Sequence, residues 1–324
     1  MNAITINNKS TYALTPQKKV GIFDFPFTLN PYIGCEMGCM YCFVPKIIIK
    51  KSRDDFFHNV EIKENVPTLL KKELKKYSNL PQHLKRVQIG VTTELFQPKV
   101  IQSGKINLGY DPIEKILEIF YEEDQKGNHW MIHLLTKNHN IVKYKNLLSK
   151  MKHMVQVEIS IIHHDEKISR KYENYTSTIK RRLDAIETLS QNGIFVRVMA
   201  MPFYGNQNDL DILKNMVFAE GASAFKNKSL NYYDWTSFDG MTLSSVLERT
   251  TIKTNTHMSN YIIKSGEELS NRRRVSAVLP KDRYRGDKFI NWAIHPDEGL
   301  QTKKLKPVDM GYKKISKYNW KYIN

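Results

Sequence analysis

Hydrophobic residues along the chain gather in short runs that predict buried β-strands. Each run is bounded by glycine, proline or polar residues, as is typical of strands in a sheet. The runs cover residues 25–30, 87–91, 130–135, 155–161 and 194–199, and a sixth candidate lies at 222–225.

Between these runs the apolar residues recur at every third or fourth position, which predicts amphipathic helices. The helices are expected at residues 66–74, 112–127, 141–151, 177–193 and 208–220. Asp111 before Pro112 predicts the start of one helix, because Asp accepts from free backbone amides and Pro suits the first helical position. Ser177 is expected to cap another helix, which Gly193 ends.

The alternation of strands and helices predicts a parallel α/β fold. Strands separated by helices of about 10–15 residues form βαβ units whose strands lie parallel in one sheet. We therefore expect a core domain over residues 1–228, which includes an N-terminal lead-in. Residues 229–324 are irregular, aromatic and basic. They are expected to form an extension that packs on the core and is a candidate substrate-binding part.

The composition sets limits on the class of protein. A chain of 324 residues with 41% hydrophobic content suits one large domain or two smaller ones. No apolar stretch reaches the roughly 20 residues that a membrane helix needs. Residues 1–10 are polar and lack the apolar core of a signal peptide. A cytoplasmic protein without a membrane partner is therefore expected.

The charge of the chain points to an anionic partner. The formal net charge is +17, with 50 Lys and Arg against 33 Asp and Glu. A charge of this size favours DNA or RNA, whose phosphates pair with arginine and whose bases stack on tyrosine. The alternative is a basic surface with no nucleic acid, since many lysines fall on solvated helix faces. The candidate contacts are Arg272, Arg273, Arg274, Arg283, Tyr284 and Arg285.

The only cysteines of the chain are three residues of one short loop, Cys35, Cys39 and Cys42. Three thiolates at this C-x3-C-x2-C spacing can hold three corners of a cubic iron–sulfur cluster. No fourth cysteine is present, so one iron would stay open to a small molecule. Glycines beside the sulfurs allow the backbone to approach such a cluster closely.

Other metal sites are less well supported by the sequence. His58 could complete a structural zinc site with the cysteines, but zinc sites normally combine two pairs of ligands. His163 and His164 are adjacent, and adjacent residues of a strand point to opposite faces of the sheet. A metal shared by these two histidines is therefore not expected.

Polar residues follow the predicted strands at their C-terminal ends, where parallel α/β folds bind ligands. The cysteine loop follows the first strand. Thr93 and Glu94 follow the second strand, Lys137 follows the third, and Ser160 lies near the end of the fourth. An amine, a carboxylate and a ribose would find partners at this edge. Each of these residues alone is equally compatible with a solvated loop or a polar pocket wall.

The cysteine motif resembles the signature of the radical SAM superfamily. The wider sequence Asn30-Pro31-Tyr32-x-Gly34-Cys35-x2-Gly38-Cys39-x-Tyr41-Cys42 resembles the group related to spore photoproduct lyase, often called DNA repair photolyase-like. Later segments agree, namely Gly90–Glu94 with Gln97-Pro98, Leu135–Lys137, Glu158–Ser160 and Arg182–Ile186 leading to Met201-Pro202. The similarity covers about residues 25–225.

This resemblance implies a partial (β/α)6 TIM-type barrel with a [4Fe–4S] cluster and S-adenosylmethionine (SAM) as cofactors. The cysteines Cys35, Cys39 and Cys42 would ligate the cluster, and the amine and carboxylate of SAM would chelate the fourth iron. The implied SAM contacts are Tyr41 and Phe43 at the adenine, Thr93 or Glu94 at the amine, Lys137 at the carboxylate and Ser160 at the ribose.

The resemblance also implies an enzyme that cleaves SAM reductively to a 5′-deoxyadenosyl radical, with an electron donor such as flavodoxin or ferredoxin. The charge favours a nucleic acid or nucleotide substrate. Modification of a peptide, protein or small metabolite stays open, as does a non-catalytic metal-containing nucleic-acid-binding protein. The reaction class, lyase or transferase, is also open. Spore photoproduct lyase uses a further cysteine as hydrogen donor, and this chain has none left, so only a tyrosine could substitute.

Overall fold

The computed structural model describes most of the first 229 residues and four short strands beyond them. The described residues are 3–7, 9–16, 26–80, 85–229, 260–263, 268–269, 312–316 and 319–322. The arginine and tyrosine residues predicted to contact nucleic acid, Arg272 to Arg274 and Arg283 to Arg285, lie outside them. The division at residues 228 and 229 stays a prediction.

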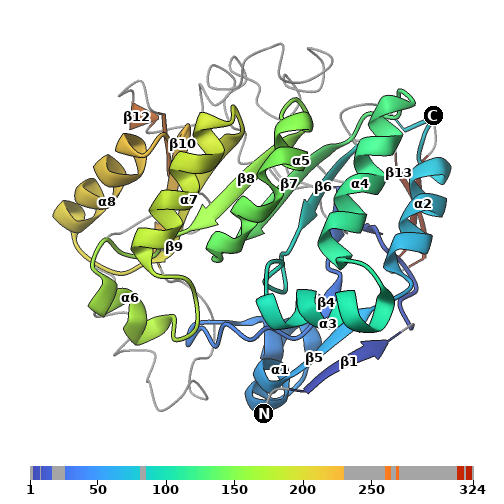
Figure 1. Cartoon of the computed structure of the whole chain (residues 1–324), viewed down its shortest axis with the longest axis horizontal. Coiled ribbons are helices and arrows are strands. Elements are labelled where there is room, and N and C mark those ends of the chain that lie inside the picture. The colour runs from blue at the N-terminus through green and yellow to red at the C-terminus, as the bar shows by residue number, and fades with distance from the viewer. Residues whose placement is uncertain are drawn as a thin grey trace.

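One sheet of nine strands organises the fold, in the order β12-β11-β10-β9-β8-β7-β6-β3-β2 (Figure 1). Six neighbouring strands are parallel. They are β3 (Phe27–Leu29), β6 (Arg86–Ile89), β7 (Met131–Thr136), β8 (Val155–Ser160), β9 (Phe195–Phe203) and β10 (Ala224–Ser229). The sixth strand is thus confirmed.

The two ends of the sheet are antiparallel, and they do not pair with each other in the part of the chain that the structure describes. On one side β2 (Thr15–Pro16) pairs with β3, and on the other β10 is followed by β11 (Asn260–Ile263) and β12 (Glu268–Leu269). The sheet is therefore open between β2 and β12 in the described residues. This arrangement, six parallel strands without closure, confirms the predicted partial barrel.

Helices connect the parallel strands, and Figure 1 shows α4, α5, α7 and α8 on the same face of the sheet. They include α2 (Val66–Lys76), α3 (Pro98–Leu108), α4 (Pro112–Gln125), α5 (Lys145–Lys150), α6 (Glu166–Tyr172), α7 (Ile179–Gln191) and α8 (Gln207–Ala219). The sequence patterns did not predict α3 and α6. Among the described helices, none has both the length and the apolar character needed to cross a bilayer.

A smaller unit beside the sheet carries the N-terminal part of the chain. It contains β1 (Ala3–Asn7), β4 (Tyr32–Ile33) and β5 (Asn59–Lys63) in the order β1-β5-β4, with π-helix η1 (Val44–Ile49) and α1 (Arg53–His58) before β5. A separate hairpin is formed by β13 (Tyr312–Ser316) and β14 (Asn319–Tyr322). None of these elements was predicted from the periodicity.

The helix starts show which capping predictions hold. Asp111 accepts hydrogen bonds from the backbone amides of Ile113 and Glu114, at 3.0 and 3.3 Å, so the predicted start of α4 is confirmed. The predicted cap of α7 is wrong by one residue, because Thr178 accepts from the amide of Arg181. The Ser177 hydroxyl instead accepts from the amide of His139 at 2.9 Å.

The helix predicted over residues 141–151 consists of two pieces. A 3-10 helix, η3 (His139–Tyr144), comes first and α5 follows it directly. Asn138 caps the first piece, because its side chain accepts from the amide of Asn140 at 3.0 Å. The chain therefore turns into a helix earlier and more tightly than the apolar spacing indicates.

The core lies between the sheet and the helices that cover it. Every residue of β8 is buried, as expected for a central parallel strand covered on both faces. Beside it Trp130 is 1% exposed and packs against Phe27 and Phe120, with ring centroids 5.5 and 6.2 Å away. This aromatic group joins β3, α4 and the start of β7.

Removing the Phe120 ring should destabilise the whole sheet. Phe120→Ala leaves a cavity beside Trp130, and we expect a loss of about 3–5 kcal/mol in the free energy of unfolding. The control is Ile106→Ala on α3, where the side chain is 72% exposed, with an expected change within about 0.5 kcal/mol. Urea unfolding followed by circular dichroism measures both, and equal losses would contradict the assigned core.

Candidate cofactor site

The cysteine loop follows β3 and β4 and lies against the start of β5. Gly34 has a φ of +101°, and a Cβ at this position would lie 2.6 Å from the carbonyl oxygen of Asn59. Only glycine fits this conformation and this close approach. The amide of Cys35 donates to the carbonyl of Phe56 at 3.0 Å. The first thiol of the motif is thereby anchored to α1.

The three thiols line one cavity of about 190 Å³. Polar residues at the ends of β6, β7 and β8 share this cavity, and its remaining wall is mostly apolar. The lining includes Cys35, Cys39, Cys42, Tyr41, Phe43, Thr93, Glu94, Lys137, Ser160, Met199 and Met201. The structure therefore brings together all nine residues proposed from the sequence for the cluster and SAM.

The thiols are held where a free thiolate is unfavourable. Burial raises the pKa of Cys35 to about 12 and also raises the pKa values of Cys39 and Cys42. A metal supplies the positive charge that removes the proton from a coordinating thiol. Three thiols that line one cavity, with Cys39 buried and Cys35 and Cys42 partly buried, thus fit a bound metal group better than they fit solvent-exposed redox chemistry.

Glu94 joins the ends of β6 and β7. Its carboxylate accepts from the Thr136 hydroxyl at 2.6 Å and from the amides of Lys137 and Phe96 at 2.7 and 3.0 Å. Burial raises the pKa of Glu94, although these hydrogen bonds oppose the shift. One carboxylate oxygen accepts only a single described hydrogen bond, from Lys137, so it retains capacity for a ligand on the cavity side.

The side chains of Thr93 and Gln97 form hydrogen bonds to the backbone of the cysteine loop. The Thr93 hydroxyl donates to the carbonyl of Gly34 at 2.6 Å, and the Gln97 side-chain oxygen accepts from the amide of Glu36 at 2.7 Å. The Thr93 hydroxyl hydrogen is thus already used within the protein. Between Thr93 and Glu94, the geometry favours Glu94 as the residue that can accept from a ligand amine.

Lys137 supplies a positive charge to the cavity. Its Nζ atom lies 5.6 Å from the centre of the Tyr41 ring. Burial acts to lower the pKa of Lys137, but the neighbouring side chains of Cys39, Glu173 and Cys42 raise it above its usual value. The ammonium group is therefore retained and is suited to an anionic group of a ligand.

Ser160 offers an unused hydroxyl at the end of β8. Its side chain is 0% exposed, and the Oγ atom has no hydrogen-bond partner among the described residues. Buried hydroxyl groups without a partner are uncommon, because each such group costs about 1–3 kcal/mol. Since Ser160 lines the cavity, a polar group of a bound ligand would satisfy it.

A buried ion pair beneath the loop was not predicted from the sequence. Arg182 Nη1 lies 2.7 Å from Glu173 Oε2, and the two side chains are 1% and 0% exposed. Burial acts to raise the pKa of Glu173, but Arg182, Lys137 and the Tyr41 hydroxyl lower it, so Glu173 stays ionised. The Tyr41 hydroxyl donates to Glu173, which connects the pair to the cysteine motif.

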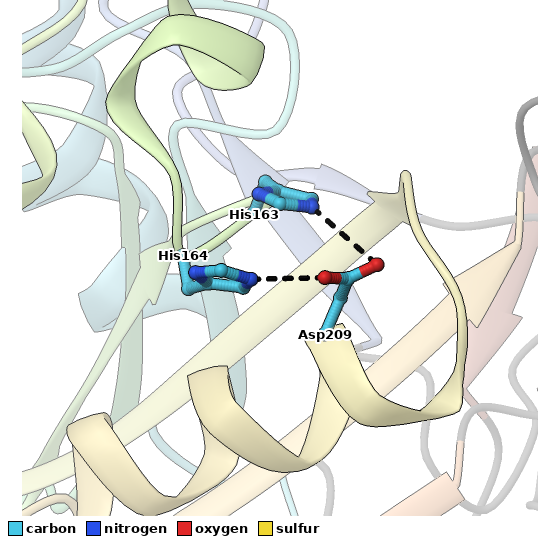
Figure 2. A group of neighbouring side chains, drawn as sticks. All are labelled: His163, His164 and Asp209. Carbon is cyan, nitrogen blue, oxygen red and sulfur yellow. Dashed lines mark hydrogen bonds and ion pairs between the residues drawn. The ribbon is translucent and has the colours of Figure 1, made fainter.

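A second polar group lies beyond the cavity, at the loop after β8. Figure 2 shows the rings of His163 and His164 lying side by side with both pointing toward Asp209. The rings are stacked at 4.4 Å, and their Nε2 atoms lie 3.9 and 3.0 Å from the Asp209 oxygens. The expectation of opposite faces is therefore wrong, because both histidines lie after the end of β8, where the strand alternation no longer applies.

The hydrogen bonds of this group oppose a metal. The Nδ1 atom of His163 accepts from the amide of Asp165 at 2.9 Å, so the proton of the neutral ring is on Nε2 and faces Asp209. A histidine that binds metal through Nε2 would instead donate from Nδ1. Asp209 also accepts from the amide of Asn206 in the capping box of α8. The group is thus a hydrogen-bonded link between the β8 loop and α8.

The sequence matches one protein-family model. The model described as the Radical SAM superfamily matches residues 29–219, which is more than half of the chain. The matched region contains the cysteine loop and all the strand ends that line the cavity. This superfamily uses a [4Fe–4S] cluster and SAM, so the predicted family and its cofactors are confirmed.

Curated relatives cover only part of this chain. It is 24% identical over 193 residues to an uncharacterized protein of Methanocaldococcus jannaschii, a match that covers 58% of this chain and 63% of the relative. It is 25% identical over 220 residues to an uncharacterized protein of Mycobacterium bovis, with 65% and 60% covered. The chain thus spans about three fifths of the length of these relatives.

Solved structures share the fold. A variant of spore photoproduct lyase with bound AdoMet and dinucleoside spore photoproduct matches with a TM-score of 0.53 and 12% identity, covering 90% of this chain and 80% of the lyase. A second variant of the same lyase matches with a TM-score of 0.51, also at 12% identity. At this identity the similarity supports the fold alone.

The tautomer of His163 leads to a prediction about pH. Burial and the nearby His164 lower the pKa of His163 below 6.5, although Asp209 and Asp165 oppose the shift. As the pH falls through 6.5, the unfolded chain takes up a proton that the folded chain does not, so stability declines. His163→Asn keeps an acceptor for the Asp165 amide without titrating, and should lose less stability than the wild type between pH 7.5 and 5.5.

Urea unfolding at the two pH values measures this difference. His58→Asn is the control, because His58 is exposed on α1 with 54% of its side chain accessible. The control should change the free energy of unfolding at pH 7.5 by no more than about 0.5 kcal/mol. A His163→Asn protein with the same pH dependence as the wild type would contradict the assigned tautomer.

Proposed function

Because the chain belongs to the radical SAM superfamily, we propose that it is an enzyme that cleaves SAM reductively, with a [4Fe–4S] cluster held by Cys35, Cys39 and Cys42. The observation that carries this proposal is the shared cavity, which is lined by the three thiols and by Ser160, whose hydroxyl has no hydrogen-bond partner among the described residues. The three-cysteine set leaves the fourth position of a cluster without a protein thiol.

In this proposal, different residues of the cavity bind different groups of SAM. Lys137 carries the charge suited to the methionyl carboxylate, and Glu94 keeps acceptor capacity for the amine. Ser160 offers its hydroxyl to the ribose. Thr93 acts indirectly, because its hydroxyl holds Gly34 in place.

Aromatic and apolar side chains form the rest of the cavity. Tyr41 and Phe43 flank the last cysteine of the motif and line the cavity, which supports their proposed position at the adenine. Met199, Met201 and Pro202 of β9 also line the cavity. A cluster held by Cys35, Cys39 and Cys42 would supply the electron for the reductive cleavage of SAM, and SAM would supply the radical chemistry of hydrogen abstraction from a substrate.

The substrate that we propose is a nucleic acid or a nucleotide. Its support is the net charge of +17 and the arginine and tyrosine residues near 272–285. The fold is also shared with a lyase structure that contains a dinucleoside spore photoproduct. The chain has three cysteines in total, all in the cluster motif, so it cannot supply a cysteine as the hydrogen donor. A reductant such as flavodoxin or ferredoxin is the further partner that we propose.

Anaerobic reconstitution tests the cluster and SAM cleavage together. The wild type should bind about four irons per chain and turn brown, and should release 5′-deoxyadenosine when dithionite and SAM are added. Cys39→Ala should lose both properties. Ser160→Ala should keep its iron but bind SAM about 2–10-fold more weakly, as expected for one lost hydrogen bond.

Two outcomes would contradict this part of the proposal. A colourless protein with one zinc would exclude the cluster. A brown protein with four irons that releases no 5′-deoxyadenosine would favour a metal-containing binding protein without catalysis.

Salt dependence tests the proposed substrate class separately. Each phosphate contact contributes a slope of about −0.9 to a plot of log K against log salt concentration for duplex DNA. The triple variant Arg272→Gln, Arg273→Gln, Arg274→Gln should therefore reduce the slope by up to about three. The control replaces the exposed lysines Lys71, Lys72 and Lys75 of α2 with Gln, and should leave the slope nearly unchanged.

Fluorescence anisotropy with duplex and single-stranded oligonucleotides at several salt concentrations gives these slopes. No binding even at low salt would contradict the nucleic-acid substrate and would favour a peptide or small metabolite. Equal effects of the two triple variants would contradict the specific role of the arginines.

A further inference from the structure

Side chains of opposite charge hold the cysteine loop from two sides. On one side is Arg53, the first residue of α1. Its Nη1 atom donates to the carbonyl of Cys42 and its Nη2 atom donates to the carbonyl of Cys39, each at 3.1 Å. The guanidinium also lies over the Phe57 ring, 4.9 Å from its centre. One planar cation thus fixes the carbonyls of two of the three cysteines.

The other side of the loop is held by Glu173, which follows α6. Its backbone forms an antiparallel bridge with Cys39, and the amide of Met40 donates to the carbonyl of Tyr172 at 2.8 Å. The Glu173 side chain is fully buried and accepts from the Tyr41 hydroxyl. A buried carboxylate therefore meets the loop at both its backbone and its aromatic residue.

Arg182 connects Glu173 to the end of β8. Besides pairing with Glu173, its Nη1 atom donates to the carbonyl of Ser160 at 2.7 Å. Its Nε atom donates to the carbonyl of Ser177 at 2.8 Å. The position of Glu173 is thus fixed by α7 and by the strand end that carries the unsatisfied Ser160 hydroxyl.

We propose that Arg53 and Glu173 are positioning residues that shift the reduction potential of the cluster in opposite directions. The inference rests on the proposed function, since it requires the cluster at the three cysteines. Reduction adds a negative charge, which a nearby cation favours and a nearby anion disfavours. These effects are strong in a buried site, where the dielectric constant is low, and charge near a cluster is a known determinant of its potential.

The opposed signs separate this role from a merely structural one. If Arg53 and Glu173 only held the loop in shape, removing either residue would loosen the same loop. The two removals would then not shift the reduction potential in opposite directions. If their charges act on the cluster, Arg53→Gln makes its surroundings more negative and Glu173→Gln makes them more positive. The two substitutions remove one charge each and keep a hydrogen-bonding side chain.

The test uses the full chain, reconstituted anaerobically with iron and sulfide. The potential is measured by dye-mediated titration, with the electron paramagnetic resonance signal of the reduced cluster as readout. Arg53→Gln should shift the midpoint to a more negative value and Glu173→Gln to a more positive one. Arg53→Lys keeps the charge and should stay closer to the wild type than Arg53→Gln. Tyr41→Phe removes a hydrogen bond of Glu173 without changing charge, and should shift the midpoint less than Glu173→Gln.

Shifts of the same sign in Arg53→Gln and Glu173→Gln would overturn the inference, as would midpoints equal to that of the wild type. Glu173→Gln leaves Arg182 without its buried partner and could be too unstable to retain four irons. In that case the comparison of Arg53→Gln with Arg53→Lys tests the inference. Equal midpoints for Arg53→Gln and Arg53→Lys would then overturn it. Failure of the wild type to assemble any cluster would instead contradict the proposed function itself.

Discussion

The parallel pairing of the six central strands is the constraint on which the site depends. Parallel strands all end at the same edge of a sheet. Residues far apart in sequence, such as Thr93 after β6, Lys137 after β7 and Ser160 at the end of β8, therefore reach one cavity. The cysteine loop reaches the same edge because it follows β3, which pairs with β6. Gly34 then allows the loop to fold against β5, since any side chain there would meet the Asn59 carbonyl.

The site also depends on buried charged side chains. Glu94, Glu173 and Arg182 are all nearly inaccessible to solvent. Removing one member of the Glu173–Arg182 pair would cost about 3–5 kcal/mol, because the remaining buried charge would be left without compensation. In this protein the contacts of these buried groups also shape the site. Glu94 bonds to the Lys137 amide and the Thr136 hydroxyl, while Arg182 bonds to the Ser160 carbonyl. The same hydrogen bonds therefore stabilise the fold and fix the strand ends around the cavity.

Sequence reasoning found the elements whose signals are local. Strands β6 to β9 and helices α2, α4, α7 and α8 have clear apolar periods, and the strand ends follow from the parallel order. The role of Glu173 was not predicted, because Glu173 is 132 residues away in sequence from Tyr41, the residue that it contacts in the fold. Arg53 was missed, and the orientation expected for His163 and His164 was wrong, for a different reason: neither a short helix nor a turn after a strand has a period that orients its side chains. A better signal was available in the segment Glu173 to Arg182, where two opposite charges flank the start of a predicted helix.

The charges around the cavity also explain why a metal and a zwitterionic ligand suit it together. Burial acts to lower the pKa of Lys137, but the side chains of Cys39, Glu173 and Cys42 together raise it. A metal held by the three cysteines would bind them as thiolates and share their negative charge, which would leave the ammonium of Lys137 available to another anion. Glu173 cannot serve as that anion alone, because Arg182 and the Tyr41 hydroxyl already bind its carboxylate. A carboxylate of the ligand would supply a negative charge to pair with Lys137. An ammonium group of the same ligand could donate to the Glu94 oxygen that retains acceptor capacity. The cavity is thus suited to a ligand that carries an ammonium and a carboxylate on the same carbon, which is the arrangement at the methionyl end of SAM.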